Sequence, residues 1–124
     1  MIAQDLIKCV GQPYQRVDEK GKALGCMLPV YLLYPNSPRF KWPPRYKLGV
    51  FMEQQFDKHA TKIDMKDIQP GDVVLIKLFE GLLHPAVYLG NDKVAHCLDS
   101  TGIQLSRLSP MRVKGVYRIC QQAD

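Results

Sequence analysis

The sequence predicts a single α+β domain covering residues 1–124, with helices in the first half and an antiparallel sheet in the second. Its 124 residues match the size of one domain, and its 46% hydrophobic and 23% charged residues are typical of a globular chain. At Gln69-Pro70-Gly71-Asp72 the pattern changes to short β-branched runs separated by turn residues. Helices followed by a series of strands are typical of the α+β class.

The first half is expected to contain three short helical segments. Residues 1–10 form the first, with an apolar face made by Ile2, Leu6, Ile7, Cys9 and Val10. The second follows Cys26, runs from Met27 to Tyr34 and stops at Pro35. Residues 35–46 are rich in proline and aromatic side chains, which favours an ordered loop packed on the domain. Residues 47–58 are expected to form the third helix, with Val50, Phe51 and Phe56 facing inward.

The second half predicts a five-stranded antiparallel sheet. The expected strands cover residues 73–79, 83–89, 93–98, 102–106 and 113–119. Gly90-Asn91-Asp92 has the residues of a hairpin turn between the second and third of these strands.

Charge and cysteine content argue against several kinds of function, with a basic nucleic-acid binder kept as a third alternative. The net charge of +5 and pI near 9.1 suit an acidic partner, but the basic residues are scattered and form no nucleic-acid motif. The four cysteines contain no C-x-x-C pair, so we expect reduced thiols, no zinc site and no other cofactor. No apolar run approaches the ~18–20 residues that span a bilayer, and the start lacks the pattern of a signal peptide. We therefore expect a protein made in the cytoplasm and not inserted in a membrane.

Cys26 is the strongest candidate nucleophile. Proline is tolerated only in the first turn of a helix, so Pro29 places the helix start at or near Cys26. Unpaired N–H groups at a helix start favour a thiolate and would stabilise an oxyanion. The alternative is that Cys26 is a small apolar core residue, as most free cysteines are.

Two histidines supply a candidate base and a group to orient it. If residues 90–92 form a three-residue turn, His96 lies opposite Ala86 and shares one face of the sheet with His84. One imidazole would accept the thiol proton, and the other would fix its tautomer and orientation. A two-residue turn would place the two histidines on opposite faces, and two unrelated histidines remain the alternative.

The other reactive side chains are weaker candidates. Cys9 is expected in the apolar face of the first helix, Cys97 in the core and Cys120 at the end of the last strand. His59 is expected to be exposed just after a helix. Tyr14 follows Gly11-Gln12-Pro13 and is a candidate hydrogen-bonding partner for the site, with simple packing as its alternative.

The order of these features resembles the NlpC-type cysteine peptidases, papain-like enzymes that cleave the peptide stems of bacterial peptidoglycan. The resemblance covers about residues 1–120. It is carried, in order, by Gly11-Gln12-Pro13-Tyr14, Cys26, Pro70-Gly71-Asp72-Val73-Val74-Leu75, His84-Pro85-Ala86-Val87-Tyr88-Leu89-Gly90, Val94-Ala95-His96 and Gly115-Val116-Tyr117-Arg118. The last segment is similar to the end of the short phage cell-wall peptidases.

The resemblance implies a papain-like fold in which Cys26, His84 and His96 form the catalytic triad, with Tyr14 and Met27 supporting substrate or oxyanion. It implies cleavage of stem peptides at the bond between D-glutamate and the diamino acid, by an enzyme associated with a phage tail or prophage. The basic surface suits an anionic wall, and phage tail proteins are expected partners. A non-catalytic wall-binding or tail-structural module with the same fold is the alternative.

The chain departs from the family pattern around the nucleophile. The family usually has Asp before the cysteine and a small pair after it, where this chain has Gly25 and Met27-Leu28-Pro29. Bulky residues there would narrow or reshape the cleft, so both specificity and activity are in question. A related permuted branch places its histidines before the cysteine. Cys120 would take that role, but too few residues follow it to form a helix.

Overall fold

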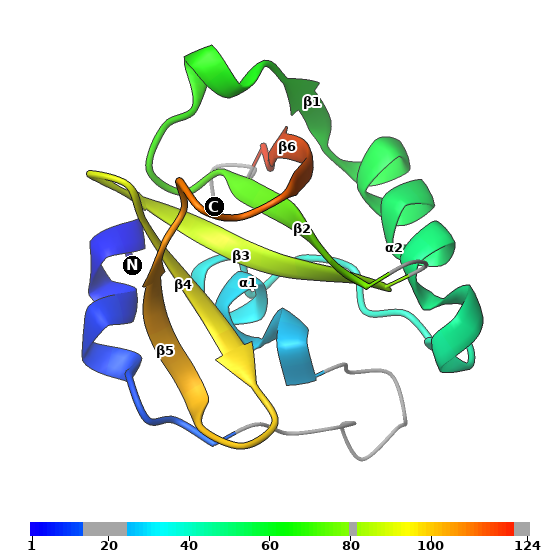
Figure 1. Cartoon of the computed structure of the whole chain (residues 1–124), viewed down its shortest axis with the longest axis horizontal. Coiled ribbons are helices and arrows are strands. Elements are labelled where there is room, and N and C mark those ends of the chain that lie inside the picture. Colours follow the sequence, from blue (N-terminus) through cyan, green and yellow to red (C-terminus); the bar gives the residue numbers. More distant parts are fainter. Residues whose placement is uncertain (14–24, 80–81, 121–124) are drawn as a thin grey trace.

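A computed structural model describes residues 1–13, 25–79 and 82–120 (Figure 1). It is an α+β domain, as the sequence predicts. Its helical segments are the 3-10 helices η1 (Ala3–Cys9), η2 (Gly25–Met27) and η3 (Met65–Asp67) and the α-helices α1 (Leu28–Leu33) and α2 (Arg45–His59). Among the described residues, no helix is long and apolar enough to cross a bilayer.

Within the described residues, the sheet has six antiparallel strands rather than the five expected. The strands are β1 (Thr61–Ile63), β2 (Val73–Phe79), β3 (Leu82–Gly90), β4 (Lys93–Leu98), β5 (Gly102–Arg107) and β6 (Val113–Arg118), in the order β1-β6-β2-β3-β4-β5. The additional strand, β1, pairs with β6 directly after α2 ends. Three residues are too few to show the alternation of apolar and polar side chains that identifies a strand.

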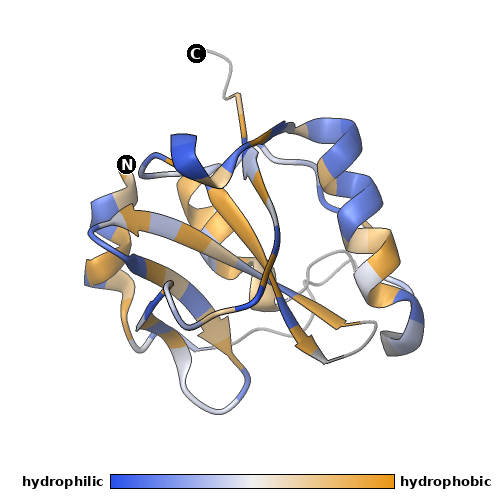
Figure 2. Ribbon diagram, turned by 45° about the horizontal axis from the view of Figure 1, so that its top comes forward, coloured by the Kyte–Doolittle hydropathy of each residue, from blue (hydrophilic) through white to orange (hydrophobic). Residues whose placement is uncertain are grey.

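The helices cover one face of this sheet. Apolar side chains of η1, α1 and α2 form the main core cluster with inward residues of the strands, among them Leu75, Val87, Ala95 and Tyr117. The opposite face carries a smaller cluster that includes Val74, Ile76, Ala86 and Val94, covered in part by Leu108. Figure 2 shows hydrophobic residues along the central strands and hydrophilic residues along the C-terminal half of α2. Neighbouring residues of a strand point to opposite faces, so each strand residue of the candidate site lies on only one of these two faces.

The turn between β3 and β4 has two residues rather than three. Asn91 and Asp92 both have positive φ angles, 52° and 62°, and Gly90 pairs with Lys93. This is the backbone of a type I′ turn. The register shifts between Tyr88 and Gly90, and this bulge inserts one residue into β3. The bulge offsets the shorter turn, so His84 and His96 share one face after all.

The inward faces of two helical segments differ from the expectation. In α2, Val50 is 62% exposed, while Met52 is fully buried and Phe56 is buried as expected. The η1 segment has three residues per turn, so Ala3 and Leu6 face the core and Ile7 lies outside. The predicted apolar face is therefore correct for Leu6 and Cys9, which pack on the core, and wrong for the exposed Ile2, Ile7 and Val10.

The Pro70-Gly71-Asp72 segment has a structural role at the start of β2. Asp72 is 3% exposed and accepts hydrogen bonds from Arg118 Nε and Nη2, both at 3.0 Å. It also accepts one from the Gln69 backbone N–H at 2.8 Å. Tyr34 donates its hydroxyl hydrogen to the Gly71 carbonyl at 2.7 Å. These bonds tie the end of β6 and the end of α1 to the start of β2.

Candidate active site

The two histidines lie together in a buried position on the sheet. His84 Nε2 and His96 Nδ1 are 3.0 Å apart, and the ring centroids are 5.1 Å apart at an interplanar angle of 81°. His84 pairs with Ile76 across β2 and β3, so both imidazoles lie on the face of the smaller cluster. This contact uses one nitrogen of His84 and leaves Nδ1 for another partner.

Ser106 extends this pair into a chain of three side chains. His96 Nε2 lies 2.6 Å from Ser106 Oγ, on the neighbouring strand β5. Both nitrogens of His96 therefore have a hydrogen-bonding partner. Ser106 was not among the residues predicted from the sequence. The available signal was its register, because Ser106 pairs with Val94 and so shares a face with His96, two residues along β4.

Burial keeps both imidazoles neutral near pH 7. Only 5% of His84 and 6% of His96 is exposed. Desolvation, and to a lesser extent the nearby charge of a protonated His96, together lower the pKa of His84 to about 4. Desolvation also lowers the pKa of His96. A neutral His84 can accept a proton, which a general base must do.

Cys26 lies in η2, immediately before α1, in agreement with the start that Pro29 predicts. The η2 segment packs against β3 and β4. The thiol is partly buried against the main core cluster and lies within electrostatic range of Cys97. Cys97 is fully buried on the helical face of β4, the face opposite to that of His96. The hydrogen bonds of the described residues include none between the Cys26 thiol and either imidazole.

The expectation that the helix start makes Cys26 a thiolate is wrong for the resting protein. The pKa of Cys26 is raised to about 12, chiefly by desolvation and in the same direction by the charge of a Cys97 thiolate. A backbone hydrogen bond at Cys26 lowers the pKa but does not offset burial. The resting site therefore contains a neutral thiol and a neutral imidazole.

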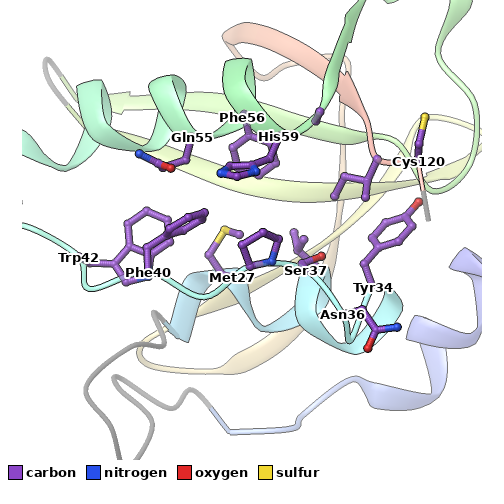
Figure 3. Close-up of a pocket in the computed structure, with 14 residues that line it drawn as sticks. Met27, Tyr34, Asn36, Ser37, Phe40, Trp42, Gln55, Phe56, His59 and Cys120 are labelled. Atoms are coloured by element: carbon purple, nitrogen blue, oxygen red, sulfur yellow. The ribbon is translucent and has the colours of Figure 1, made fainter. Parts of the chain in front are cut away.

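The other predicted residues either fall outside the described part of the chain or line a cavity to which neither His84 nor His96 contributes. Tyr14 falls outside the described residues. Met27 is buried in the main core cluster and lines a cavity of about 490 Å³ between α1, the 35–44 loop and the end of α2 (Figure 3). His59 and Cys120 line the same cavity. Figure 3 places Cys120 near the Tyr34 hydroxyl, at the end of β6.

Comparison with known proteins gives the family. The model of the NlpC/P60 family matches residues 38–120, which include both histidines and begin after Cys26. The chain belongs to the NlpC/P60 family. The matched residues are about two thirds of the chain, and they contain the sheet that positions the histidine pair.

Similar proteins agree with this assignment over most of the fold. NlpC1 from Trichomonas vaginalis is 20% identical with a TM-score of 0.60, over 94% of this chain and 42% of that protein. An NlpC/P60 family protein from Bacillus cereus ATCC 10987 is 17% identical, with a TM-score of 0.59. The match covers 96% of this chain and 40% of the Bacillus cereus chain. The TM-scores indicate a shared fold.

One curated relative has a named activity. Gamma-DL-glutamyl hydrolase from Bacillus subtilis (strain 168) is 35% identical over 50 residues, which are 40% of this chain and 12% of the relative. The chain therefore spans well under half the length of each of these three proteins.

Proposed function

We propose that this domain is a cysteine hydrolase that cleaves amide bonds in the peptide stems of peptidoglycan. Cys26 would be the nucleophile, His84 the general base and His96 the residue that orients the base. The observation that carries the proposal is the 3.0 Å contact between His84 Nε2 and His96 Nδ1, because it directs the other nitrogen of His84 away from His96. Membership of the NlpC/P60 family supports the same reaction class.

The reaction would proceed through a thioester. Sγ of Cys26 attacks the amide carbonyl while its proton passes to His84 Nδ1. The tetrahedral intermediate collapses when His84 returns this proton to the leaving amine, and Cys26 is left acylated. Water then attacks the thioester, His84 accepts a proton from it, and the thiol is restored as the acid product leaves. His96 stabilises His84 during the steps in which the imidazole is protonated.

The protonation states of the resting site and the approach of the Cys26 thiol to His84 both affect this mechanism. Because the thiol and the imidazole are both neutral, the proton moves during attack rather than before it. Sγ must also come within hydrogen-bonding distance of His84 Nδ1 in the substrate complex. Catalytic hydrogen bonds are often long in proteins without substrate and tighten when it binds.

The substrate bond we propose lies between D-glutamate and the diamino acid of the stem peptide. The γ-glutamyl bond in the name of the Bacillus subtilis relative supports this choice. The net charge of +5 suits binding to an anionic wall. We further propose that the domain acts at the wall as part of a phage tail or prophage product, with tail proteins as partners.

Digestion of purified cell walls tests this function. The wild-type protein should release fragments whose masses show a new D-glutamate carboxyl end and a new diamino acid amino end. Cys26→Ala should release none, whereas Cys120→Ala, which changes an exposed thiol, should leave the fragments unchanged. Walls left intact by the wild-type protein would contradict the proposal.

A second candidate is a non-catalytic module that binds the wall or builds a tail while keeping the fold. The raised pKa of Cys26 and its lack of a described hydrogen bond to His84 favour this reading. A sedimentation assay separates the two candidates. The module would bind intact walls, Cys26→Ala would bind equally well, and neither protein would release fragments.

A further inference from the structure

The geometry points to Ser106 as a positioning residue that fixes where the protons lie in the histidine pair. Its hydroxyl oxygen accepts a hydrogen bond from His96 Nε2–H, and this holds His84 in the tautomer with a bare Nδ1. The inference deepens the proposed function, because it concerns the base of the same site. Ser106 acts through His96 and lies two side chains away from the reacting atoms.

The distances restrict the chain of three groups to two arrangements. Between His84 Nε2 and His96 Nδ1, at 3.0 Å, one nitrogen carries a hydrogen and the other a lone pair. The same holds between His96 Nε2 and Ser106 Oγ at 2.6 Å, where the hydroxyl is able to donate or accept. A neutral imidazole has one N–H, so the direction of the second bond fixes the direction of the first.

Only one of these arrangements leaves His84 able to act as a base. If Ser106 accepts from His96 Nε2–H, then His96 Nδ1 is bare and accepts from His84 Nε2–H, so His84 Nδ1 carries a lone pair. If Ser106 donates instead, every bond reverses and His84 Nδ1 carries the hydrogen. Ser106 is partly exposed, so water can take its hydroxyl hydrogen while its oxygen faces His96.

The sheet provides this contact through Ser106 rather than through the residue directly opposite His96. That residue is Gln104, whose side-chain oxygen accepts a hydrogen bond from the Thr101 hydroxyl at 3.1 Å. Ser106, two residues further along β5, places its hydroxyl oxygen 2.6 Å from His96 Nε2. Its position depends on the register between β4 and β5, which pairs it with Val94.

Nitrogen NMR of histidine side chains tests the inference without reference to activity. The chain has only three histidines, and His59 is exposed and outside the pair, so the signals are assignable with single substitutions. In the wild-type protein at pH 7, His96 should be protonated at Nε2 and bare at Nδ1, and His84 likewise. Finding the hydrogen on His96 Nδ1 would overturn the inference.

Substitutions separate positioning from a general structural role. Ser106→Ala should replace the single tautomer of His96 with a mixture, and Ser106→Thr, which restores a hydroxyl, should return the single tautomer. Ser109→Ala is the matched control, because Ser109 lies in the turn after β5, donates its hydroxyl hydrogen to Asp92 at 2.8 Å and has no described hydrogen bond to either histidine. A single Nε2–H tautomer in Ser106→Ala would show that Ser106 does not select it.

Kinetics on the wall substrate complete the test. Ser106→Ala should lower kcat about five- to tenfold with little change in KM, the loss expected for one neutral hydrogen bond. Ser106→Thr should recover most of it. If the wild-type protein proves inactive, the proposed function fails, but the NMR result still decides whether Ser106 sets the tautomers. An unchanged kcat in a folded Ser106→Ala with mixed tautomers would overturn the role in catalysis.

Discussion

At the residue scale, the site is defined by burial more than by charge. The same desolvation that lowers the pKa of His84 raises that of Cys26, and both groups become neutral at physiological pH. A helix start was expected to favour the thiolate, but the first turn here is a three-residue 3-10 segment packed against the core. Sequence indicated where Cys26 would lie; it could not indicate how much water would reach the thiol.

The pH dependence of activity should reflect this neutral pair. His84 must be unprotonated to act as the base, so kcat/KM should rise as pH increases through about 4 and then stay level across neutrality. The thiol, with a pKa of about 12, should add no further rise near pH 8 or 9. A pH–rate profile measures this, with circular dichroism at each pH to confirm that the protein remains folded. A profile that rises near pH 8 would indicate attack by a pre-formed thiolate.

At the element scale, the sequence pattern predicted the five main strands within one residue at either end, because β-branched runs and turn residues mark them. It did not predict β1, which is too short to show a pattern, or the bulge next to Gly90. That bulge matters for the site, since a two-residue turn alone would have turned His84 and His96 to opposite faces. The number of turn residues in sequence does not fix the register when a bulge is present.

Residues 11–13, which follow η1, pack closely against the start of β5 and form backbone hydrogen bonds with it. Gly102 has a φ of +73°, and a Cβ atom there would lie far too close to the Gln12 carbonyl oxygen. The Gly11 backbone N–H donates a hydrogen bond to the Ile103 carbonyl at 2.8 Å, and the Ile103 N–H donates one to the Gln12 carbonyl at 2.9 Å. The alignment of β5, and with it the position of Ser106, depends on this close approach.

Gly102→Ala should therefore lower the free energy of unfolding by roughly 2–4 kcal/mol, through backbone strain and the clash with the 11–13 segment. Urea unfolding measures the effect. Gly11→Ala is the matched control: Gly11 also has a positive φ, +89°, but its added Cβ would meet no atom within 4 Å. Gly11→Ala should lower the free energy of unfolding by about 1 kcal/mol. Equal losses in the two variants would show that the close approach contributes nothing.

At the scale of the whole molecule, sequence order and family resemblance predicted one α+β domain, and the comparisons confirm the family. The two faces of the sheet were harder to predict. Cys26 belongs to the main cluster on the helical face, while the histidines lie on the other face. How near the Cys26 thiol comes to the imidazoles therefore depends on how η2 packs against β3 and β4. Such an arrangement follows from the packing of the complete chain and leaves no local pattern in the sequence.

The stability of the domain should depend on pH because of the buried histidines. His84 has a lower pKa in the folded protein, about 4, than in the unfolded chain, about 6.5. The unfolded chain therefore binds more protons between these values, and stability falls as pH decreases from 6.5 to 4. The loss should reach about 3 kcal/mol, measured by urea unfolding at a series of pH values. His84→Gln should weaken this dependence; an unchanged slope would contradict the buried neutral state.

The central claim is that bound substrate meets Cys26, although its resting thiol is partly buried and neutral. Peptide mapping by mass spectrometry after two alkylations tests it most directly. A stem peptide ending in a chloromethyl ketone should modify Cys26, and His84→Ala should slow this at least tenfold. Plain iodoacetamide should modify the exposed Cys120 faster than Cys26. Modification by the peptide reagent at Cys120, or at the same rate on several cysteines, would contradict the claim.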